Sequence, residues 1–220
     1  MTAPTRVCAA CGAPVRVPFR VPPAEQAPDL DGRPGEPTRS TLAHWIATCR
    51  RCRASAPDLA DLPHGAGRVV KSEAYQVLQG PFLRWAALCE ATGRQAEAAE
   101  AVLQGAWALD DADEDAAALR LRAVALWGEP QSTEDALRIV DIQRRAGAFD
   151  AALSAAARLD GADLDENSAA ILAFQRGRIA AGDQGRHGIG SALRPPARRP
   201  HVTHGRQTGA GGWWQRLFGA

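Results

Sequence analysis

No run of apolar residues in this chain approaches the roughly 18 consecutive positions that a membrane-spanning helix needs. The first residues, MTAPTRVCAACG, also lack the charged and then apolar pattern of a secretory signal peptide. We therefore expect a cytoplasmic protein. In that compartment thiols stay reduced, so paired cysteines favour metal binding over disulfide formation.

Short motifs that carry catalysis or nucleotide binding are absent as well. The chain contains no P-loop, no G-x-G-x-x-G, no H-E-x-x-H and no G-x-S-x-G. The histidines lie near the N-terminal cysteines, in a loop or in the last part of the chain, where nothing indicates an acid–base pair. They are His44, His64, His187, His201 and His204. These absences argue against an enzyme.

Acidic residues are missing from one part of the chain, and this divides it into three blocks of charge. Residues 184–220 carry six arginines and no acid, net +6, whereas residues 1–70 carry nine basic and six acidic side chains, net +3. Residues 71–183 carry eleven basic and nineteen acidic side chains, net −8. We take these blocks as an N-terminal module, a helical domain and a basic tail. Lysine is nearly absent, but a coding bias explains that as readily as function does.

Four of the five cysteines form two C-x-x-C pairs, Cys8 with Cys11 and Cys49 with Cys52, with 37 residues between the pairs. Each pair can form a tight turn whose backbone amides point at the thiolates, and two such turns complete a tetrahedron around one zinc ion. The alternatives are an iron site and four unligated thiols. Four thiolates leave no open coordination position, so the metal would fold this module and perform no chemistry.

The residues around the pairs favour a small zinc ribbon. Gly12 follows the first pair, as expected where the turn needs a positive φ, whereas Arg53 takes that place after the second pair. Residues 15–21, VRVPFRV, alternate in the manner of a strand, and residues 41–49 run into the second pair. Residues 22–40 between them are rich in Pro, Gly and charge, which predicts an exposed excursion.

Several arginines near the cysteines raise the question of nucleic-acid binding. They are Arg6, Arg16, Arg20, Arg50, Arg51 and Arg53. The excursion adds four acids, namely Glu25, Asp29, Asp31 and Glu36. No series of aromatic residues interleaves the arginines, so we interpret them as a solvated surface. A nucleic-acid- or ribosome-associated zinc ribbon is the alternative, and a steep salt dependence of binding would distinguish it.

From Ser72 onward the pattern is helical, with glycine, proline or a capping residue at most of the helix boundaries. Helices are predicted over residues 80–93, 94–110, 116–127, 136–147, 150–159 and 166–183. Ser132 opens a capping box before the fourth of them. Phe82, Trp85 and Cys89 share one face of the first helix, so Cys89 is expected to be a buried core thiol.

Two helix junctions, GRQAEA at residues 93–98 and GAFDAA at residues 147–152, resemble the corner of the tetratricopeptide (TPR) repeat. There, glycine turns the corner and a small alanine permits close helix crossing. Gly182 follows Gly147 by 35 residues, close to the 34-residue period of that repeat. Gly93 and Gly147 are 54 residues apart, which predicts that an extra helix interrupts the array, and the full Trp–Leu–Gly–Tyr signature is absent.

The predicted fold is therefore mostly α. A small zinc-ribbon β element precedes antiparallel TPR-like hairpins, with an irregular helical domain as the alternative. Residues 184–212 have the composition of a disordered linker. On a helix, four apolar residues of the final WWQRLFGA would share one face, namely Trp213, Trp214, Leu217 and Phe218. This motif is expected to dock on the acidic helical domain or on a partner, unless it is an inert end.

A two-knuckle zinc ribbon followed by such hairpins resembles an uncharacterised bacterial family of cytoplasmic proteins. The features that carry the resemblance are CAAC, WIATCRRCRASAPDL, LQGAWALDDA and IQRRAGAFDAAL, and it covers roughly residues 5–185. It implies a fold, but no functional residues beyond the four cysteine ligands. We expect a non-enzymatic, zinc-binding scaffold whose helical domain binds protein or peptide partners.

Overall fold

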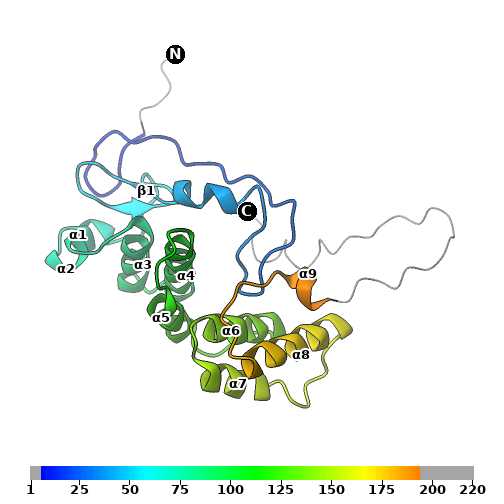
Figure 1. Cartoon of the computed structure of the whole chain (residues 1–220). Helices are drawn as coiled ribbons and strands as arrows, with labels where there is room; N and C mark the ends of the chain where they lie inside the picture. The colour runs from blue at the N-terminus through cyan, green and yellow to red at the C-terminus, as the bar shows by residue number, and fades with distance from the viewer. Residues whose placement is uncertain (1–5, 194–220) are drawn as a thin grey trace, which may run out of the picture.

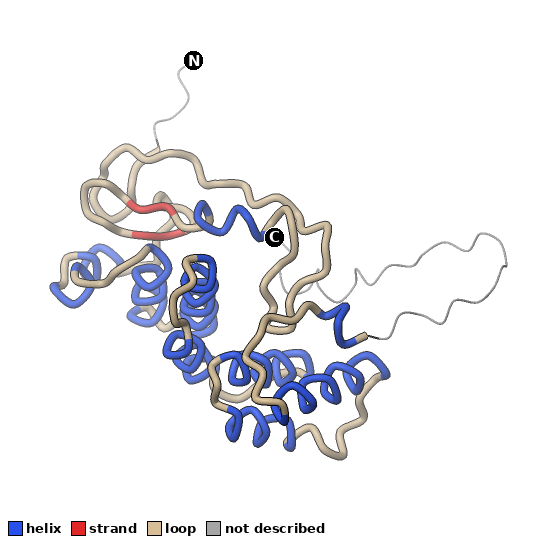
Figure 2. The backbone as a smooth tube through the Cα atoms, in the orientation of Figure 1, coloured by secondary structure: helices blue, strands red, loops and turns tan. Residues whose placement is uncertain are grey.

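The computed structural model describes residues 6–193, in which a small N-terminal module lies across one side of a curved row of helices (Figure 1). The N-terminal module contains η1 (Arg39–His44), β1 (Ala47–Thr48), β2 (Ser55–Ala56), α1 (Ala66–Val70) and α2 (Glu73–Gln76). The row is α3 (Pro81–Ala91), α4 (Gln95–Asp111), α5 (Ala117–Trp127), α6 (Thr133–Arg145), α7 (Phe149–Ala157) and α8 (Glu166–Ala180), followed by the short α9 (Ile189–Ala192). The fold is mostly helical with one small antiparallel sheet, as predicted (Figure 2). None of these helices is long and apolar enough to cross a membrane.

The six helices predicted from the sequence are confirmed as α3 to α8, with boundaries within three residues. The capping box begins α6, because the side chain of Ser132 accepts a hydrogen bond from the N–H of Asp135 at 3.1 Å. The short helices η1, α1 and α9 are not predicted by the sequence, since four to six residues are too few to show a helical period.

The end of α3 is typical of how these helices stop. Gly93 has a φ of 78°, and the N–H of Arg94 donates to the carbonyl of Cys89 at 2.8 Å, which closes a Schellman turn. The same turn follows α6 at Gly147 and α8 at Gly182. It also follows α4, where Asp113 takes the positive φ without being glycine.

These stops recur regularly along the array. The positive-φ residues after α3, α5 and α7 are at positions 93, 128 and 161, which are 35 and 33 residues apart. Those after α4, α6 and α8 are at positions 113, 147 and 182, which are 34 and 35 residues apart. The extra helix predicted between Gly93 and Gly147 is α5, which packs between α4 and α6 and continues the row. The regular spacing of the stops is hidden in the sequence because Asp113 takes the positive φ where the other stops have glycine.

The alternating segment 15–21 does not form the predicted strand. Val7 and Pro14 form an isolated bridge, and the N–H of Val15 donates to the carbonyl of Arg6 at 2.9 Å. Within the described part of the chain, residues 16–21 have no backbone hydrogen-bond partner, and Val17 is exposed. Alternation alone does not make a strand when no neighbouring strand is available to pair with it.

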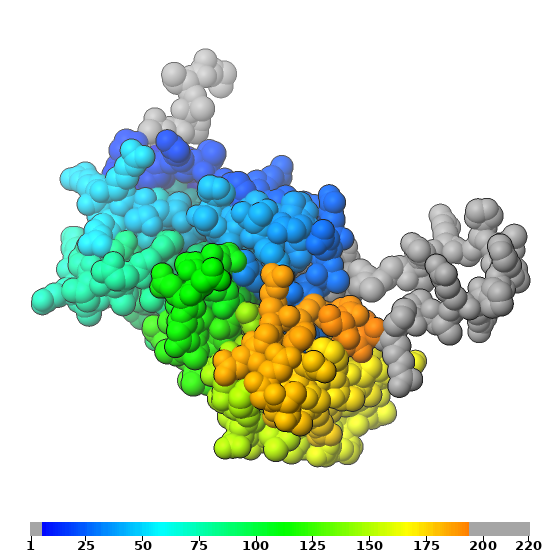
Figure 3. All heavy atoms as spheres, in the orientation of Figure 1, coloured from blue at the N-terminus to red at the C-terminus, as the bar shows by residue number. Residues whose placement is uncertain are grey.

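The predicted exposed excursion is also wrong in its central part, because residues 28–35 are buried beside α4 and α6 (Figure 1). In Figure 3 the chain after α8, coloured orange, lies on the surface between the N-terminal module and α8. Leu30 joins the apolar core formed by α6, α7 and α8. Asp31 is fully buried and pairs with Arg145. Arg33 is buried and pairs with Asp111 at 2.6 Å. The composition of this segment suggests a loop in water, but its partners lie more than 70 residues away in the sequence.

The chain after α8 returns to cover this segment. The N–H of Leu30 donates to the carbonyl of His187 at 2.9 Å, and the N–H of Ile189 donates to the carbonyl of Pro28 at 3.0 Å. Ile189 is buried in the same core as Leu30. Residues 184–193 are therefore packed on the rest of the chain, so the predicted disordered segment, set to begin at residue 184, is wrong for these residues. The tail motif Trp213, Trp214, Leu217 and Phe218 lies outside the described residues.

Two apolar cores hold the molecule together. The first contains side chains of the N-terminal module, including Cys8, Cys49 and Tyr75, together with α3, α4 and α5. The second contains Leu30 and Ile189 with α6, α7 and α8. Residues from the first 70 positions thus contribute to both cores. This arrangement fixes the position of the cysteine pairs relative to the helices.

Candidate metal centre

The two C-x-x-C pairs lie in turns with the same backbone hydrogen bonds. In the first turn, the N–H of Cys8 donates to the carbonyl of Ala13, and the N–H of Gly12 donates to the carbonyl of Cys8, both at 2.8 Å. The second turn connects β1 and β2 and repeats both bonds at 2.8 Å, from Cys49 to Ala54 and from Arg53 to Cys49. Sequence segments 37 residues apart thus build two copies of one knuckle.

The residue after each pair has a left-handed backbone. Gly12 has a φ of 70° and Arg53 has a φ of 64°. A residue with a Cβ is rarely found in this region, because the Cβ crowds the following carbonyl. Arg53 therefore replaces the expected glycine without changing the backbone conformation of the turn.

The four sulfur atoms of the knuckles lie together, all within 4.8 Å of one another. The Sγ of Cys8 is 3.8 Å from that of Cys52, and the Sγ of Cys11 is 3.7 Å from that of Cys49. Each close pair joins one knuckle to the other. Tetrahedral zinc with zinc–sulfur bonds of about 2.3 Å separates its sulfurs by about 3.8 Å, whereas a disulfide needs about 2 Å. The spacing fits one enclosed metal ion.

No other cluster of metal-ligating side chains is found in residues 6–193. His44 is not part of the cysteine group, and its ring packs against that of Phe19 with ring centroids 5.3 Å apart. His64 is not part of the group either. Cys89 is fully buried in the first core, and burial raises the pKa of its thiol to about 12, as expected of an inert core thiol.

The electrostatics of the knuckles suit thiolates that face a cation. Burial raises the pKa of Cys8, against the N–H groups of Ala10 and Cys11. At Cys49 burial also acts to raise the pKa, but hydrogen bonds from the N–H groups of Cys52 and Arg51 outweigh it and lower the value to about 7. These amides stabilise negative sulfur, as a knuckle requires. Burial and the neighbouring thiols raise the pKa of Cys52, so full ionisation of the group needs a positive charge among the sulfurs.

Two side chains of helix α2 form hydrogen bonds with the backbone of the second knuckle and of β2. The hydroxyl of the buried Tyr75 accepts a hydrogen bond from the N–H of Ser55 at 3.0 Å and donates to the carbonyl of Arg53 at 3.4 Å. The amide of Gln76 donates to the carbonyls of Cys52 at 3.1 Å and Val70 at 2.6 Å. Neither Tyr75 nor Gln76 is singled out by the sequence. Tyr75 is the only tyrosine of the chain, but nothing in its spacing links it to the cysteines.

A second concentration of ionisable groups lies where residues 28–35 meet the helices. Asp31 accepts hydrogen bonds from Arg145 and from the indole N–H of Trp107, the latter at 3.1 Å. Burial acts to raise the pKa of Asp31, but Arg145 and other arginines outweigh it and the pKa is lowered. Arg145 also pairs with Asp110 at 2.7 Å, and Asp110 pairs with Arg120. Each of these carboxylates is held by an arginine, so the network fastens the segment.

Comparison with known family models, with curated proteins and with solved structures finds no significant match to this chain.

Proposed function

We propose that this chain is a non-enzymatic, zinc-stabilised scaffold. The observation that supports this best is the closed group of four sulfurs, Cys8, Cys11, Cys49 and Cys52. An ion held by all four has no position left for water or substrate, so its role is to fold the module. Zinc is favoured over iron because paired C-x-x-C knuckles are a common zinc site and the chain shows no redox partner motif. The site needs reduced thiols, which keeps the cytoplasm as the proposed compartment.

Metal analysis tests this proposal. Protein purified under reducing conditions is expected to contain about one zinc per chain, because a single tetrahedral site is present. A variant with Cys8→Ser and Cys11→Ser is expected to lose the metal, and the control Cys89→Ser is expected to keep it. Iron in the purified protein, or no metal at all, contradicts the assignment.

The helical row supports the scaffold part of the proposal through its TPR-like features. The helix stops recur every 33 to 35 residues, close to the period of that repeat. Ala98 and Ala152, five residues after the two corner glycines, are both fully buried. Small residues at these positions let neighbouring helices approach closely. The corner at Gly93 joins α3 to α4 and the corner at Gly147 joins α6 to α7, so α5 shifts the phase between the two repeats.

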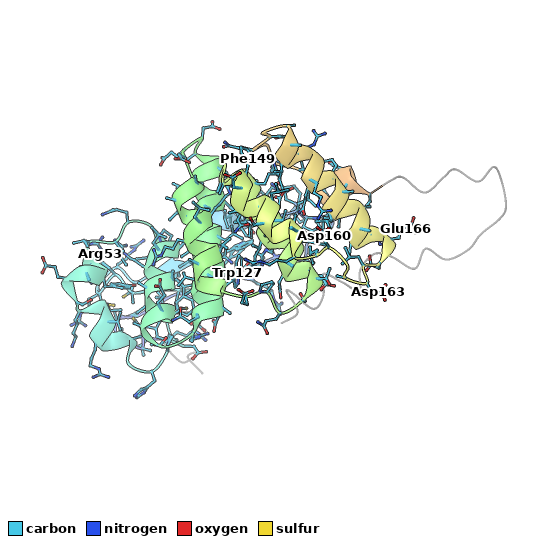
Figure 4. All side chains as sticks on the ribbon, turned by 90° about the horizontal axis from the view of Figure 1, so that it is seen from below. Arg53, Trp127, Phe149, Asp160, Asp163 and Glu166 are labelled. Atoms are coloured by element: carbon cyan, nitrogen blue, oxygen red, sulfur yellow. The ribbon has the colours of Figure 1, made fainter. Side chains whose placement is uncertain are left out.

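A partner of the helical row would bind beside the buried segment, because residues 28–35 already occupy the side of α4 and α6. A pocket of about 220 Å³ lies next to this segment, between α4, the end of α5 and the start of α6. Its apolar lining is Ala96, Trp127, Pro130 and Ile139, and its polar lining is Glu129, Gln131, Asp135 and Arg138. Figure 4 shows Trp127 at the end of α5. An apolar side chain of a peptide, flanked by polar residues, suits such a pocket.

Peptide selection on the full-length protein tests this site. We expect the selected peptides to bind at least 10-fold more weakly to Ala96→Arg, because the new side chain enters the pocket. Ala151→Arg is the matched control, since Ala151 is likewise an exposed alanine in the first turn of a helix. Equal binding to both variants would place any partner site elsewhere.

A further inference from the structure

Arginines of the helical row are almost all held by carboxylates. Those in ion pairs are Arg94, Arg120, Arg122, Arg138, Arg144, Arg145, Arg158, Arg176 and Arg178. The remaining one, Arg84, is buried and donates to the carbonyl of Leu78 at 2.8 Å. The helical domain thus has no exposed arginine without a carboxylate partner among its described residues.

The basic side chains around the two knuckles, in contrast, mostly lack a carboxylate partner. Seven cations of the N-terminal module are exposed and form no ion pair within residues 6–193. Two of them, Arg16 and Arg20, lie on the extended segment after the first knuckle. The other five belong to the second knuckle, to α1 and to the residue after α1, namely Arg50, Arg51, Arg53, Arg68 and Lys71. Such a set is available to an anion from outside the chain.

These five cations are close in space because the knuckles and α1 pack together. The guanidinium of Arg51, in the second knuckle, donates to the carbonyl of Cys11 in the first at 3.4 Å. Helix α1 lies against the first knuckle, so that a Cβ on Gly67 would be 3.7 Å from the carbonyl oxygen of Ala10. The side chain of Gln76 links the carbonyl of Val70, next to Lys71, to that of Cys52, next to Arg53. Figure 4 places Arg53 at the end of the molecule opposite α8.

Two of the four acids in residues 22–40 are engaged away from these cations. Asp29 is buried and pairs with Arg39 at 2.7 Å, and Asp31 is buried beside Arg145. Glu73 on α2 is an exposed acid of this region, whereas the exposed Asp61 acts on Arg94 of the helical row. A zinc ion with four thiolates carries a charge of −2. With Glu73 counted as well, the five cations leave a local excess of two positive charges.

We propose that this surface, formed by Arg50, Arg51, Arg53, Arg68 and Lys71, binds the phosphate backbone of nucleic acid. Unpaired guanidinium groups donate well to phosphate oxygens, and a compact cationic surface attracts a phosphate polymer over several ångströms. Binding is through the backbone without sequence preference, because no aromatic series interleaves these cations and phosphate contacts carry no sequence information. The proposal rests on the zinc-folded module of the proposed function, but not on its peptide pocket.

Fluorescence anisotropy with a labelled 20-nucleotide single-stranded RNA and a 20-base-pair DNA duplex, using the zinc-loaded full-length protein, tests the proposal. For four or five phosphate contacts, the affinity should fall between 50 mM and 200 mM salt roughly 150- to 500-fold for the duplex and roughly 50- to 130-fold for the single strand. The variant Arg50→Ser, Arg51→Ser, Arg53→Gly should lower the magnitude of the salt slope by about three. The control replaces three paired arginines of the helical row with serine, namely the exposed Arg158 and the half-buried Arg122 and Arg176. It should retain the wild-type slope.

Two further measurements keep the outcome decisive. The first is the zinc content of each variant. If the triple variant at Arg50, Arg51 and Arg53 loses zinc, the double variant Arg68→Ser, Lys71→Ser becomes the deciding variant, because both of its positions lie outside the knuckles. Wild-type binding by the deciding variant overturns the proposal, even if the arginines beyond residue 193 bind nucleic acid. A loss of zinc affinity with unchanged nucleic-acid binding would show that the cations only balance the charge of the metal site. A wild-type protein without zinc defeats the proposed function separately.

Discussion

Arg53 occupies the one place in the second knuckle where its side chain is a disadvantage to the fold. Its φ of 64° matches the 70° of Gly12 in the first knuckle, and the two residues donate equivalent hydrogen bonds of 2.8 Å. A left-handed backbone costs a residue with a Cβ roughly 1–2 kcal/mol relative to glycine. An arginine at such a position agrees with the use of its charge proposed above.

Arg53→Gly is therefore expected to stabilise the zinc-loaded protein by about 1 kcal/mol, because glycine adopts the positive φ without crowding. The greater conformational freedom of glycine in the unfolded chain offsets part of this gain. Gly12→Ala is the complementary change. A Cβ there meets nothing within 4 Å, so any loss of stability comes from the backbone alone. The free energy of unfolding from urea denaturation measures both. A less stable Arg53→Gly would show that the arginine makes a stabilising contact that outweighs its strain.

Among the elements, the segment of residues 28–35 is the least expected, since it behaves as a buried element without being a helix or a strand. Its backbone is held by the chain around His187 and Ile189, and its side chains are held by α4 and α6. Asp31 is central, because its carboxylate serves both Arg145 and Trp107.

Asp31→Ala is expected to cost about 3–5 kcal/mol of stability, since it leaves the buried guanidinium of Arg145 without one of its two carboxylates and the indole of Trp107 without an acceptor. The matched control is Arg158→Ala, which breaks an exposed pair with Glu129 and is expected to cost less than about 1 kcal/mol. Denaturant unfolding measures both changes. Similar small losses for the two variants would mean that the segment is not fastened through this carboxylate.

The elements also show why part of the fold follows from the sequence and part does not. Helices α3 to α8 could be predicted because their period, caps and stops are local, within one or two turns of the chain. The four cysteine ligands could be predicted because C-x-x-C is a local motif, and its second occurrence identifies the two ligands that complete the site. The burial of Asp31 could not be predicted, since it depends on Arg145, which is 114 residues away. The role of Tyr75 behind the second knuckle depends on packing in the same way.

At the scale of the whole molecule, the metal module and the helical row share the first core, whereas the second core is built mainly from α6, α7 and α8. The long connection between the knuckles carries residues 28–35 across to that second core. The cysteines therefore stand at both ends of the connection that bridges the two cores, and a metal held by them would act on the fold well beyond the knuckles.

Removing the metal with a chelator under reducing conditions should consequently destabilise the two cores unequally. Binding energy on the order of 10 kcal/mol is lost from the module, which is too small to fold without it. Amide hydrogen exchange is expected to rise first in the knuckles, in α1 and α2 and in residues 28–35, while α7 and α8 keep most of their protection.

The double variant Cys8→Ser, Cys11→Ser provides a second route to the same metal-free state, and Cys89→Ser with chelator omitted provides the control. Equal exchange throughout the zinc-loaded and metal-free proteins would mean that the four sulfurs do not organise the module. Equal loss of protection in α7 and α8 would mean that the second core depends on the bridging segment for its own stability. The pattern we expect lies between these extremes, because the side chains of α6, α7 and α8 bury one another, whereas the knuckles have little apolar surface of their own.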